Sequence, residues 1–159
     1  MSNEINQKFY DACQASNLNR ATQLLLDGAD VNFIGIYSES CLIISRDINI
    51  IRLLLSNGAN VNYKNNSQES AILIQAFNGH IEIVNLLLSY GANINDTDEY
   101  GDTPLILATR NGELEMAKLL LVKPCIDVSI KNKEGKEALT FAKEEDYGEL
   151  LEFYLNIRR

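Results

Sequence analysis

The strongest constraint on the fold of this chain is a ten-residue pattern that occurs three times. The copies read QLLLDGADVN at 23–32, LLLSNGANVN at 53–62 and LLLSYGANIN at 86–95. Their glycines lie 30 and then 33 residues apart (58 − 28 and 91 − 58). A period of about 33 residues is typical of proteins whose similar units stack, each burying its apolar face against its neighbours. The sequence therefore predicts a linear array of units.

One period of the pattern predicts two short helices followed by a polar loop. A hydroxyl residue of the kind that caps helix N-termini precedes three apolar stretches; these residues are Ser40, Ser70 and Thr103. Pro104 then occupies a first helical position, where its missing N–H is not needed. We expect a first helix such as 104–110, an Asn-Gly break, and a second helix such as 81–89. Gly91 closes that second helix, because glycine tolerates a left-handed backbone.

Several of these segments resemble the ankyrin repeat family in register. They are GDTPL at 101–105, NGHIEIVNLLLSYGANIN at 78–95, NGELEMAKLLL at 111–121 and SNLNRATQLLLDGADVN at 16–32. The resemblance covers nearly the whole chain. It implies one all-α ankyrin repeat domain over 1–159, a solenoid of about five helix-turn-helix units joined by hairpin-like loops. The units are expected at 4–32 (N-terminal cap), 33–62, 63–95, 96–129 and 130–159 (C-terminal cap).

The chain departs from the family pattern at two places. Ile106 stands where the family's Thr-Pro-Leu-His element has its histidine, so we expect apolar contacts there in place of hydrogen bonds between units. The second unit lacks the turn between its helices, since ISRDINI occupies 44–50, and Asp47 is expected to cap the second helix directly. This shortening is either tolerated variation in a surface turn or a notch that helps to shape a binding surface.

The stretch DTDEYGD at 96–102 carries four carboxylates and is a candidate calcium loop. Asp96, Asp98 and Gly101 match positions 1, 3 and 6 of an EF-hand loop. Position 12, which requires a bidentate glutamate, is Leu107. In the repeat register the stretch is the tip of the loop between the third and fourth units. We therefore expect no metal and no cofactor.

The residues that could carry catalysis are few and scattered. His80 is the only histidine, and the resemblance implies a structural role for it in the turn between helices. A nucleophile–histidine arrangement would have to use it, and no glycine-rich phosphate loop occurs. Cys13 and Cys41 are expected to be packing residues. The chain is therefore predicted not to be an enzyme.

Charge and composition restrict the partners and the compartment. The net charge of −8 argues against duplex DNA and anionic membranes, which both require a basic surface. Three distant cysteines do not form a disulfide framework, and the polar start does not resemble a secretory signal, so a cytoplasmic location is expected. A microbial effector that acts in the cytosol of a host cell is an open alternative.

The resemblance implies a non-catalytic adaptor, scaffold or inhibitor that binds a protein through the concave face. That face combines the first helices with the loop tips. The predicted contact residues are Ile36, Tyr37, Tyr63, Lys64, Asn66, Phe77, Asn78, Glu99, Tyr100, Asp102, Arg110, Asn111, Lys131 and Lys133. A monomer is expected, and self-association into a homo-oligomer is the alternative.

Two features of this face carry the prediction. Tyr37, Phe77 and Tyr100 supply one aromatic from each central unit, and aromatics dominate interface energy. An acidic third loop is followed by a basic fourth loop, which could set the register of a partner. The alternatives are that the tyrosines only cover neighbouring loops and that the two loops pair with one another.

Overall fold

The computed structural model describes residues 2–157, which form ten α-helices in five successive pairs and no β-strand. The pairs are α1 (Ser2–Gln14) with α2 (Leu18–Leu26), α3 (Cys41–Ile44) with α4 (Ile48–Ser56), α5 (Ala71–Phe77) with α6 (Ile81–Ser89), α7 (Pro104–Arg110) with α8 (Leu114–Leu121), and α9 (Ala138–Glu144) with α10 (Gly148–Asn156). A short 3-10 helix, η1 (Ile36–Ser38), lies between the first two pairs. The predicted all-α repeat solenoid is confirmed, and the unit boundaries stay a prediction.

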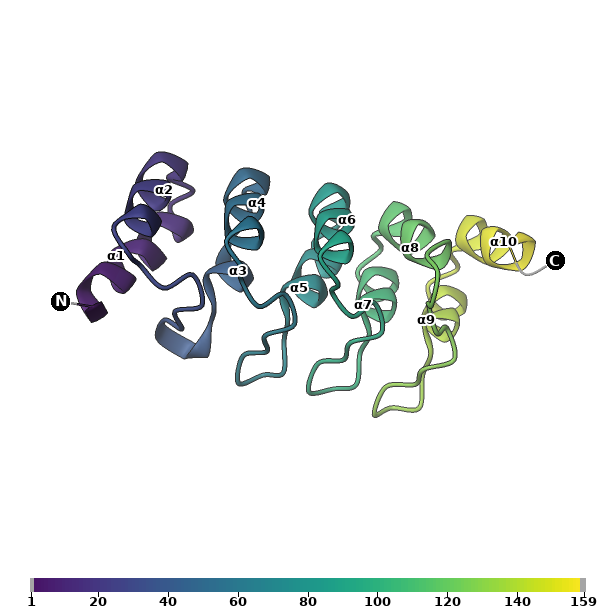
Figure 1. The fold of residues 1–159 in the computed structure, drawn as a ribbon. Helices are drawn as coiled ribbons and strands as arrows, with labels where there is room; N and C mark the ends of the chain where they lie inside the picture. Colours follow the sequence, from purple (N-terminus) through teal and green to yellow (C-terminus); the bar gives the residue numbers. More distant parts are fainter. Residues whose placement is uncertain (1, 158–159) are drawn as a thin grey trace.

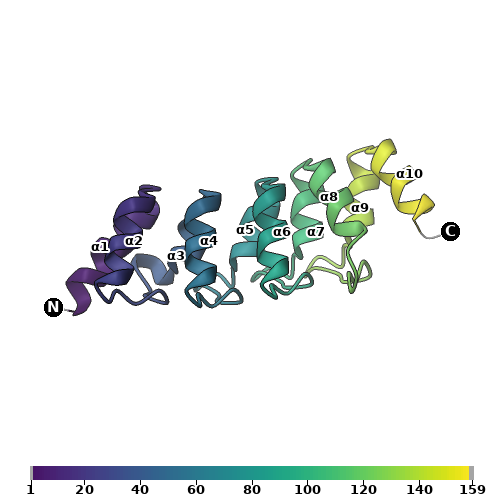
Figure 2. The ribbon, with the colours of Figure 1, turned by 45° about the horizontal axis from the view of Figure 1, so that its top comes forward.

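The pairs stand in one row, with the two termini at opposite ends (Figure 1). The second helices α2, α4, α6, α8 and α10 form one layer, and the first helices form the other (Figures 1 and 2). Four loops project beyond the first helices (Figure 1). We call them the first (33–40), second (63–70), third (96–103) and fourth (130–137) loops. The first helices and the loops together make the inner face.

Local sequence sets the helix ends. The helices predicted at 104–110 and 81–89 are observed with those bounds. Thr103 caps α7, since its Oγ1 accepts a hydrogen bond from the Ile106 N–H at 3.2 Å. Ser70 departs from this pattern, because its hydroxyl donates to the Asp96 carboxylate at 2.5 Å instead. That hydroxyl therefore links two units and caps no helix.

The shortened second unit has the predicted cap. The Asp47 Oδ1 accepts from the backbone N–H groups of Asn49 and Ile50 at 2.7 and 3.2 Å, so α4 begins without an intervening turn. The buried Gln75 of the next unit contacts the place where the turn is missing. Its Nε2 donates to the Ser45 carbonyl at 3.0 Å, and its Oε1 lies 2.6 Å from Nδ1 of His80.

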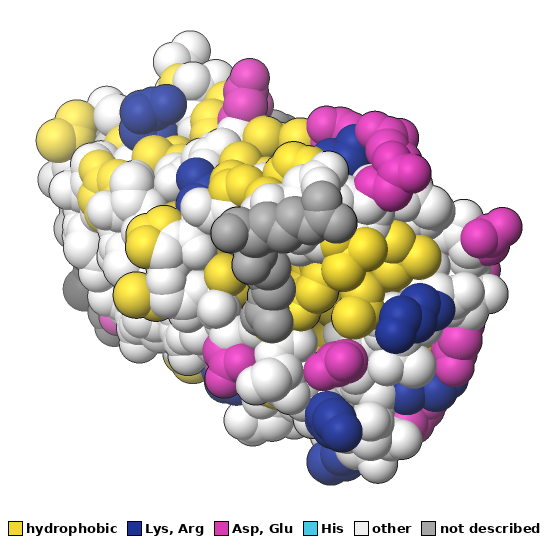
Figure 3. Space-filling model, turned by 90° about the vertical axis from the view of Figure 1, so that its right-hand side faces the viewer, with side chains coloured by type: hydrophobic (Ala, Val, Ile, Leu, Met, Phe, Trp, Pro, Cys, Tyr) yellow, Lys and Arg dark blue, Asp and Glu magenta, His cyan; other side chains and the backbone are white. Residues whose placement is uncertain are grey.

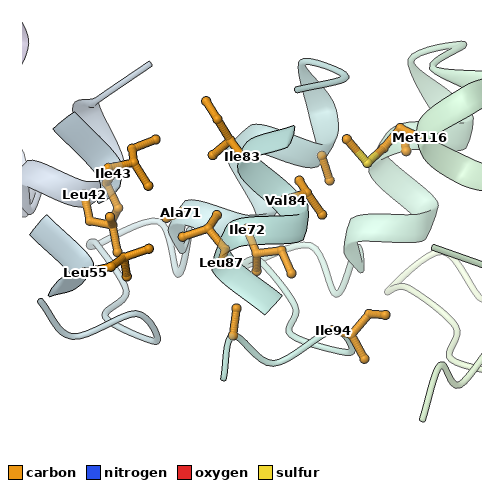
Figure 4. Close-up of a cluster of buried hydrophobic side chains, with 14 of the residues drawn as sticks. Leu42, Ile43, Leu55, Ala71, Ile72, Ile83, Val84, Leu87, Ile94 and Met116 are labelled. Atoms are coloured by element: carbon orange, nitrogen blue, oxygen red, sulfur yellow. The ribbon is translucent and has the colours of Figure 1, made fainter. Parts of the chain in front are cut away.

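The core lies between the two layers and runs through the row of units. Figure 4 shows part of it, with Ile72, Val84 and Leu87 among the buried side chains. Ile106 is buried in the same core, so the predicted apolar packing at the family's histidine position is confirmed. Cys13 and Cys41 are fully buried, as expected of packing residues. Hydrogen bonding between them, together with burial, raises the pKa of the Cys41 thiol.

Asparagine side chains join the first four units in sequence. Three asparagine oxygens each accept a hydrogen bond from a backbone N–H of the next unit, 28–32 residues further on, at 2.8–2.9 Å: Asn32 from Asn60, Asn62 from Asn93, and Asn95 from Asp127. Within the first unit, the Asn6 oxygen accepts in the same way from the Asp30 N–H at 2.8 Å. Three of these side chains also donate from Nδ2 to a carbonyl of the next unit: Asn32 to Gly58, Asn62 to Gly91, and Asn95 to Cys125. The last residue of each copy of the ten-residue pattern is thus the residue that joins neighbouring units.

Candidate partner-binding surface

The inner face carries a depression of about 330 Å³ between the third and fourth units. Two first helices, α5 and α7, form its floor, and the third loop closes one side. The lining residues are Glu69, Leu73, Ile74, Phe77, Asp98, Tyr100, Leu107 and Arg110. We call this the central depression. Three of the predicted contact residues, Phe77, Tyr100 and Arg110, meet there.

The two aromatic side chains come from different elements. Phe77 is the last residue of α5 and is 40% exposed, while Tyr100 lies on the third loop and is 62% exposed. The backbone of Tyr100 is held on both sides. Its N–H donates to the Asp98 Oδ1 at 2.8 Å, and its carbonyl accepts from the Lys133 N–H at 2.9 Å. The depression therefore presents one aromatic from a helix and one from a braced loop.

Arg110 is oriented by a buried polar network. Its Nη1 donates to the Asp102 Oδ2 at 2.5 Å, and the Nδ2 of Asn132 donates to the Asp102 Oδ1 at 2.7 Å. Asp102 is completely buried, so its predicted role as an exposed contact residue is corrected here. A buried carboxylate requires such partners to offset its lost hydration. Asp102 acts on the surface only by holding the guanidinium in place.

A family model for ankyrin repeats matches three overlapping stretches of the chain, residues 9–98, 40–133 and 95–157. The chain is an ankyrin repeat protein. No curated protein matches the sequence. Ankyrin repeats are generally protein–protein interaction modules.

Four further predicted residues of the ankyrin domain have polar groups engaged in contacts of their own. The Tyr63 hydroxyl donates to the Ser38 carbonyl at 2.9 Å, and the Lys64 Nζ contacts the Asp96 carboxylate at 2.7 Å and the Thr97 carbonyl at 2.6 Å. The Asn78 amide donates to its own helix at Ile74, and the Asn111 amide donates to the Phe77 carbonyl. Most of these groups join adjacent units, so part of their bonding capacity is already used.

The remaining predicted residues lie at the loop tips. Ile36, Tyr37, Asn66, Glu99, Lys131 and Lys133 are exposed there and do not line the central depression. Tyr37 is the most exposed aromatic of the three at 83%. The structure thus brings Phe77 and Tyr100 together and leaves Tyr37 apart on the first loop.

The acidic third loop differs from its expected form. Asp96 and Asp102 are buried, and Asp98 accepts two backbone hydrogen bonds, so only Glu99 is an exposed carboxylate at the tip. Asp96 pairs with Lys64 of the second loop. Within residues 2–157 neither Lys131 nor Lys133 forms an ion pair, and Lys136, the third lysine of the fourth loop, pairs with Glu134 and Glu144. The alternative in which the acidic and basic loops pair with one another is therefore wrong. The reason is that Asp96 and Asp102 turn inward, toward the groups that join the units.

Sequence reasoning missed part of the depression. Ile74, Asp98 and Leu107 line it and were not among the predicted contacts. Ile74 lies three residues before Phe77 on α5, which places both on one helix face, and that spacing was the available signal. Across the described range, 2–157, no group of three His, Cys, Asp or Glu side chains could hold a metal ion. None of the helices in this range combines the length and the hydrophobicity that a membrane span requires.

A second depression of about 380 Å³ adjoins the first. Its lining residues are Gln14, Ser16, Glu39, Ile43, Ile44, Arg46 and Ile74. We call this the N-terminal depression; it meets the central depression at Ile74. It lies beside the shortened turn, where α3 ends at Ile44 and leaves Arg46 exposed.

Proposed function

We propose that this ankyrin repeat domain is a non-catalytic binding module whose protein partner docks on the inner face, centred on the central depression. The observation that carries the proposal is the convergence of Phe77, Tyr100 and Arg110 around one recess. Aromatic residues and arginine are the types that contribute most to interface energy.

Rigidity of the surface supports the proposal. Arg110 is held by the carboxylate of Asp102, and Tyr100 is held through its backbone on both sides. Side chains that are already ordered lose less conformational entropy when a partner binds. A partner would therefore meet a surface that needs little rearrangement.

The composition of the recess also favours binding over chemistry. Its titratable residues are Glu69, Asp98, Tyr100 and Arg110, and three of these have hydrogen bonds to neighbouring groups that fix their position. Serine, cysteine, histidine and lysine are not among its lining residues. We accordingly propose no catalytic step at this surface.

The test begins by capturing a partner with the whole chain and identifying it by mass spectrometry. Phe77→Ala and Tyr100→Ala are each expected to weaken the affinity by about 30-fold, the effect of losing about 2 kcal/mol at a hot spot. Tyr90→Ala is the matched control, because Tyr90 is an exposed tyrosine at the end of α6, in the other layer. Tyr37→Ala decides whether the contact extends to the first loop.

The outcome that overturns the proposal is specific. Both Phe77→Ala and Tyr100→Ala would retain affinity within twofold of the wild type while their circular dichroism spectra stayed unchanged. The partner would then dock elsewhere on the domain.

One observation favours the alternative of self-association. Hydrophobic side chains gather at the C-terminal end of the row (Figure 3), where Val122, Leu155 and Ile157 are exposed. Exposed apolar clusters of this kind often mark protein contacts. Light scattering over a range of protein concentrations separates a monomer from an assembly, and Leu155→Glu should dissolve an assembly built on this end.

A reducing compartment is the proposed setting. Cys13, Cys41 and Cys125 all carry free thiols, and disulfides are rare in the cytosol. The cytoplasm meets this condition, and so does the host cytosol in which an effector would act. Fractionation followed by immunodetection tests the proposal.

A further inference from the structure

We propose that the occupant of the inner face is a basic segment of the partner that inserts two apolar side chains about one repeat apart. This inference rests on the proposed function and specifies the chemistry of the partner. Its basis is the pair of neighbouring depressions on the inner face, the central and the N-terminal, which are both lined by Ile74. We call their combined extent the inner groove.

The apolar floor of the inner groove has two centres. Ile44 ends α3 in the N-terminal depression, and Phe77 ends α5 in the central depression. Adjacent packed helices lie about 8–10 Å apart. Two side chains seven residues apart on a helix are separated by about 10.5 Å, at 1.5 Å per residue. In a polyproline II segment the matching separation is three residues, about 9.3 Å.

The rim of the groove is acidic. Glu39, Glu69 and Asp98 line it, one for each of three successive loops. Glu39 accepts from the Tyr10 hydroxyl at 3.4 Å, Glu69 accepts from the Asn65 Nδ2 at 2.8 Å, and Asp98 accepts from backbone N–H groups. Within residues 2–157 none of the three carboxylates has a cationic partner.

The positive groups of the groove do not balance this rim. Arg110 is neutralised by Asp102, which leaves Arg46 as the one guanidinium in the groove without an ion pair in the described range. Three carboxylates against one such guanidinium leave an excess of two negative charges. An uncharged apolar segment would bury these carboxylates without partners, which is unfavourable. A segment with lysine or arginine beside its apolar residues would supply the missing partners.

The net charge of the whole chain also favours a basic segment. A net charge of −8 attracts a cationic segment and speeds its encounter with the groove, more strongly at low salt. The affinity for such a segment should therefore fall as salt is added.

The hydrogen bonding of the rim allows the charges to be removed without disturbing the fold. In the triple variant Glu39→Gln/Glu69→Gln/Asp98→Asn every side chain keeps an oxygen that can accept its present hydrogen bond. The matched control is Asp27→Asn/Glu145→Gln/Glu152→Gln, which changes the net charge equally at exposed positions outside the groove. Comparison of the two variants separates a local effect from a general effect of charge.

The experiment selects random 16-residue peptides displayed on phage against the full chain, with Phe77→Ala protein as the counter-selection. Peptides that require Phe77 are expected to be positively charged and to carry two apolar residues seven or three positions apart. The groove triple variant should weaken their binding about tenfold, since each exposed charge pair is worth about 1.5- to 5-fold. The control triple variant should change it by less than about twofold. Fluorescence anisotropy at several salt concentrations measures both.

Each result decides the matter. Peptides that require Phe77 but are neutral or acidic, or that bind the groove triple variant as tightly as the wild type, overturn the inference and leave the proposed function standing. A selection that yields no peptide dependent on Phe77 overturns both.

Discussion

The first loop and the three later loops of this protein are closed by the same backbone hydrogen bond. They differ in the side-chain contacts that stabilise them. In every loop an N–H donates to the carbonyl four residues on, from Gly35 to Glu39, Asn65 to Glu69, Asp98 to Asp102, and Asn132 to Lys136. In the later loops the side chain at the first of these positions accepts two further backbone N–H groups, at 2.8–3.0 Å. In the first loop that position is Gly35, which has no side chain to do so.

The first loop is stabilised instead by contacts with a side chain of α1. A Cβ atom on Gly35 would overlap Cε2 of Tyr10, so the ring of this α1 residue occupies the space that a side chain would need. Tyr10 also packs edge-on against Phe33, with ring centroids 6.3 Å apart. One aromatic residue of the first unit thus replaces the side-chain brace of the later loops.

The difference bears on the proposed binding surface, because two tyrosines share a register position. Tyr37 of the first loop and Tyr100 of the third loop are related by one shortened unit and one full unit (37 + 30 + 33 = 100). Tyr100 lines the central depression, whereas Tyr37 does not line it and has a left-handed φ of 65° that is uncommon for a bulky residue. Two tyrosines at the same register position are therefore held in different ways, and only Tyr100 lines the central depression.

The largest expected effect comes from Gly35→Ala. Overpacking against Tyr10 should destabilise the fold by about 1–3 kcal/mol, measured as a lower urea midpoint. Gly148→Ala is the matched control, since Gly148 has open space around it, no left-handed φ, and a helical position that favours alanine. In a Tyr10→Leu background the penalty of Gly35→Ala should shrink. An unchanged penalty there would show that the ring of Tyr10 is not its cause.

A smaller effect is expected in the third loop from Asp98→Ala. Removing the acceptor of two backbone N–H groups should cost about 1–2 kcal/mol, read from chemical unfolding. Asp98→Asn keeps the acceptor oxygen and should stay within about 0.5 kcal/mol of the wild type. If both variants lose equal stability, the charge of Asp98 and not its hydrogen bonding braces the loop.

The smallest effect is expected from Tyr10→Phe, and it depends on pH. Burial, with a contribution from the charge of Glu39, raises the pKa of Tyr10 to about 12, against about 10 in an unfolded chain. The stability from the neutral phenol is fully present below pH 10 and is lost as the pH rises toward 12.

At neutral pH Tyr10→Phe should therefore cost less than about 1 kcal/mol, because the hydroxyl makes one long hydrogen bond. From pH 10 to pH 11.5 the variant should lose less stability than the wild type, as measured by urea unfolding at each pH. Tyr90→Phe, at an exposed tyrosine, should follow the wild type at both ends of this range. If Tyr10→Phe and the wild type lost the same stability over this pH range, Tyr10 would not be the source of the pH dependence.

The sequence predicted the repeat, the helices and part of the surface because these depend on local and periodic signals. Thr103, Pro104 and Asp47 set helix ends through contacts within a few residues, and each could be identified without coordinates. Phe77 and Arg110 were predicted from their register in the unit. Neither their meeting with Tyr100 around one recess nor the contribution of Ile74 was predicted, because both depend on how neighbouring units pack.

The sequence by itself determined that this chain is a stack of helix pairs, since a period of about 33 residues leaves each unit an apolar face that only a neighbour can cover. Only the tertiary structure decided which polar residues are exposed on the inner face. Asp96 and Asp102 look exposed in an acidic loop, yet they are buried by Lys64, Ser70, Arg110 and Asn132, from the units on either side or from their own. A carboxylate's burial depends on partners far away in sequence, and composition along the chain does not encode where those partners lie.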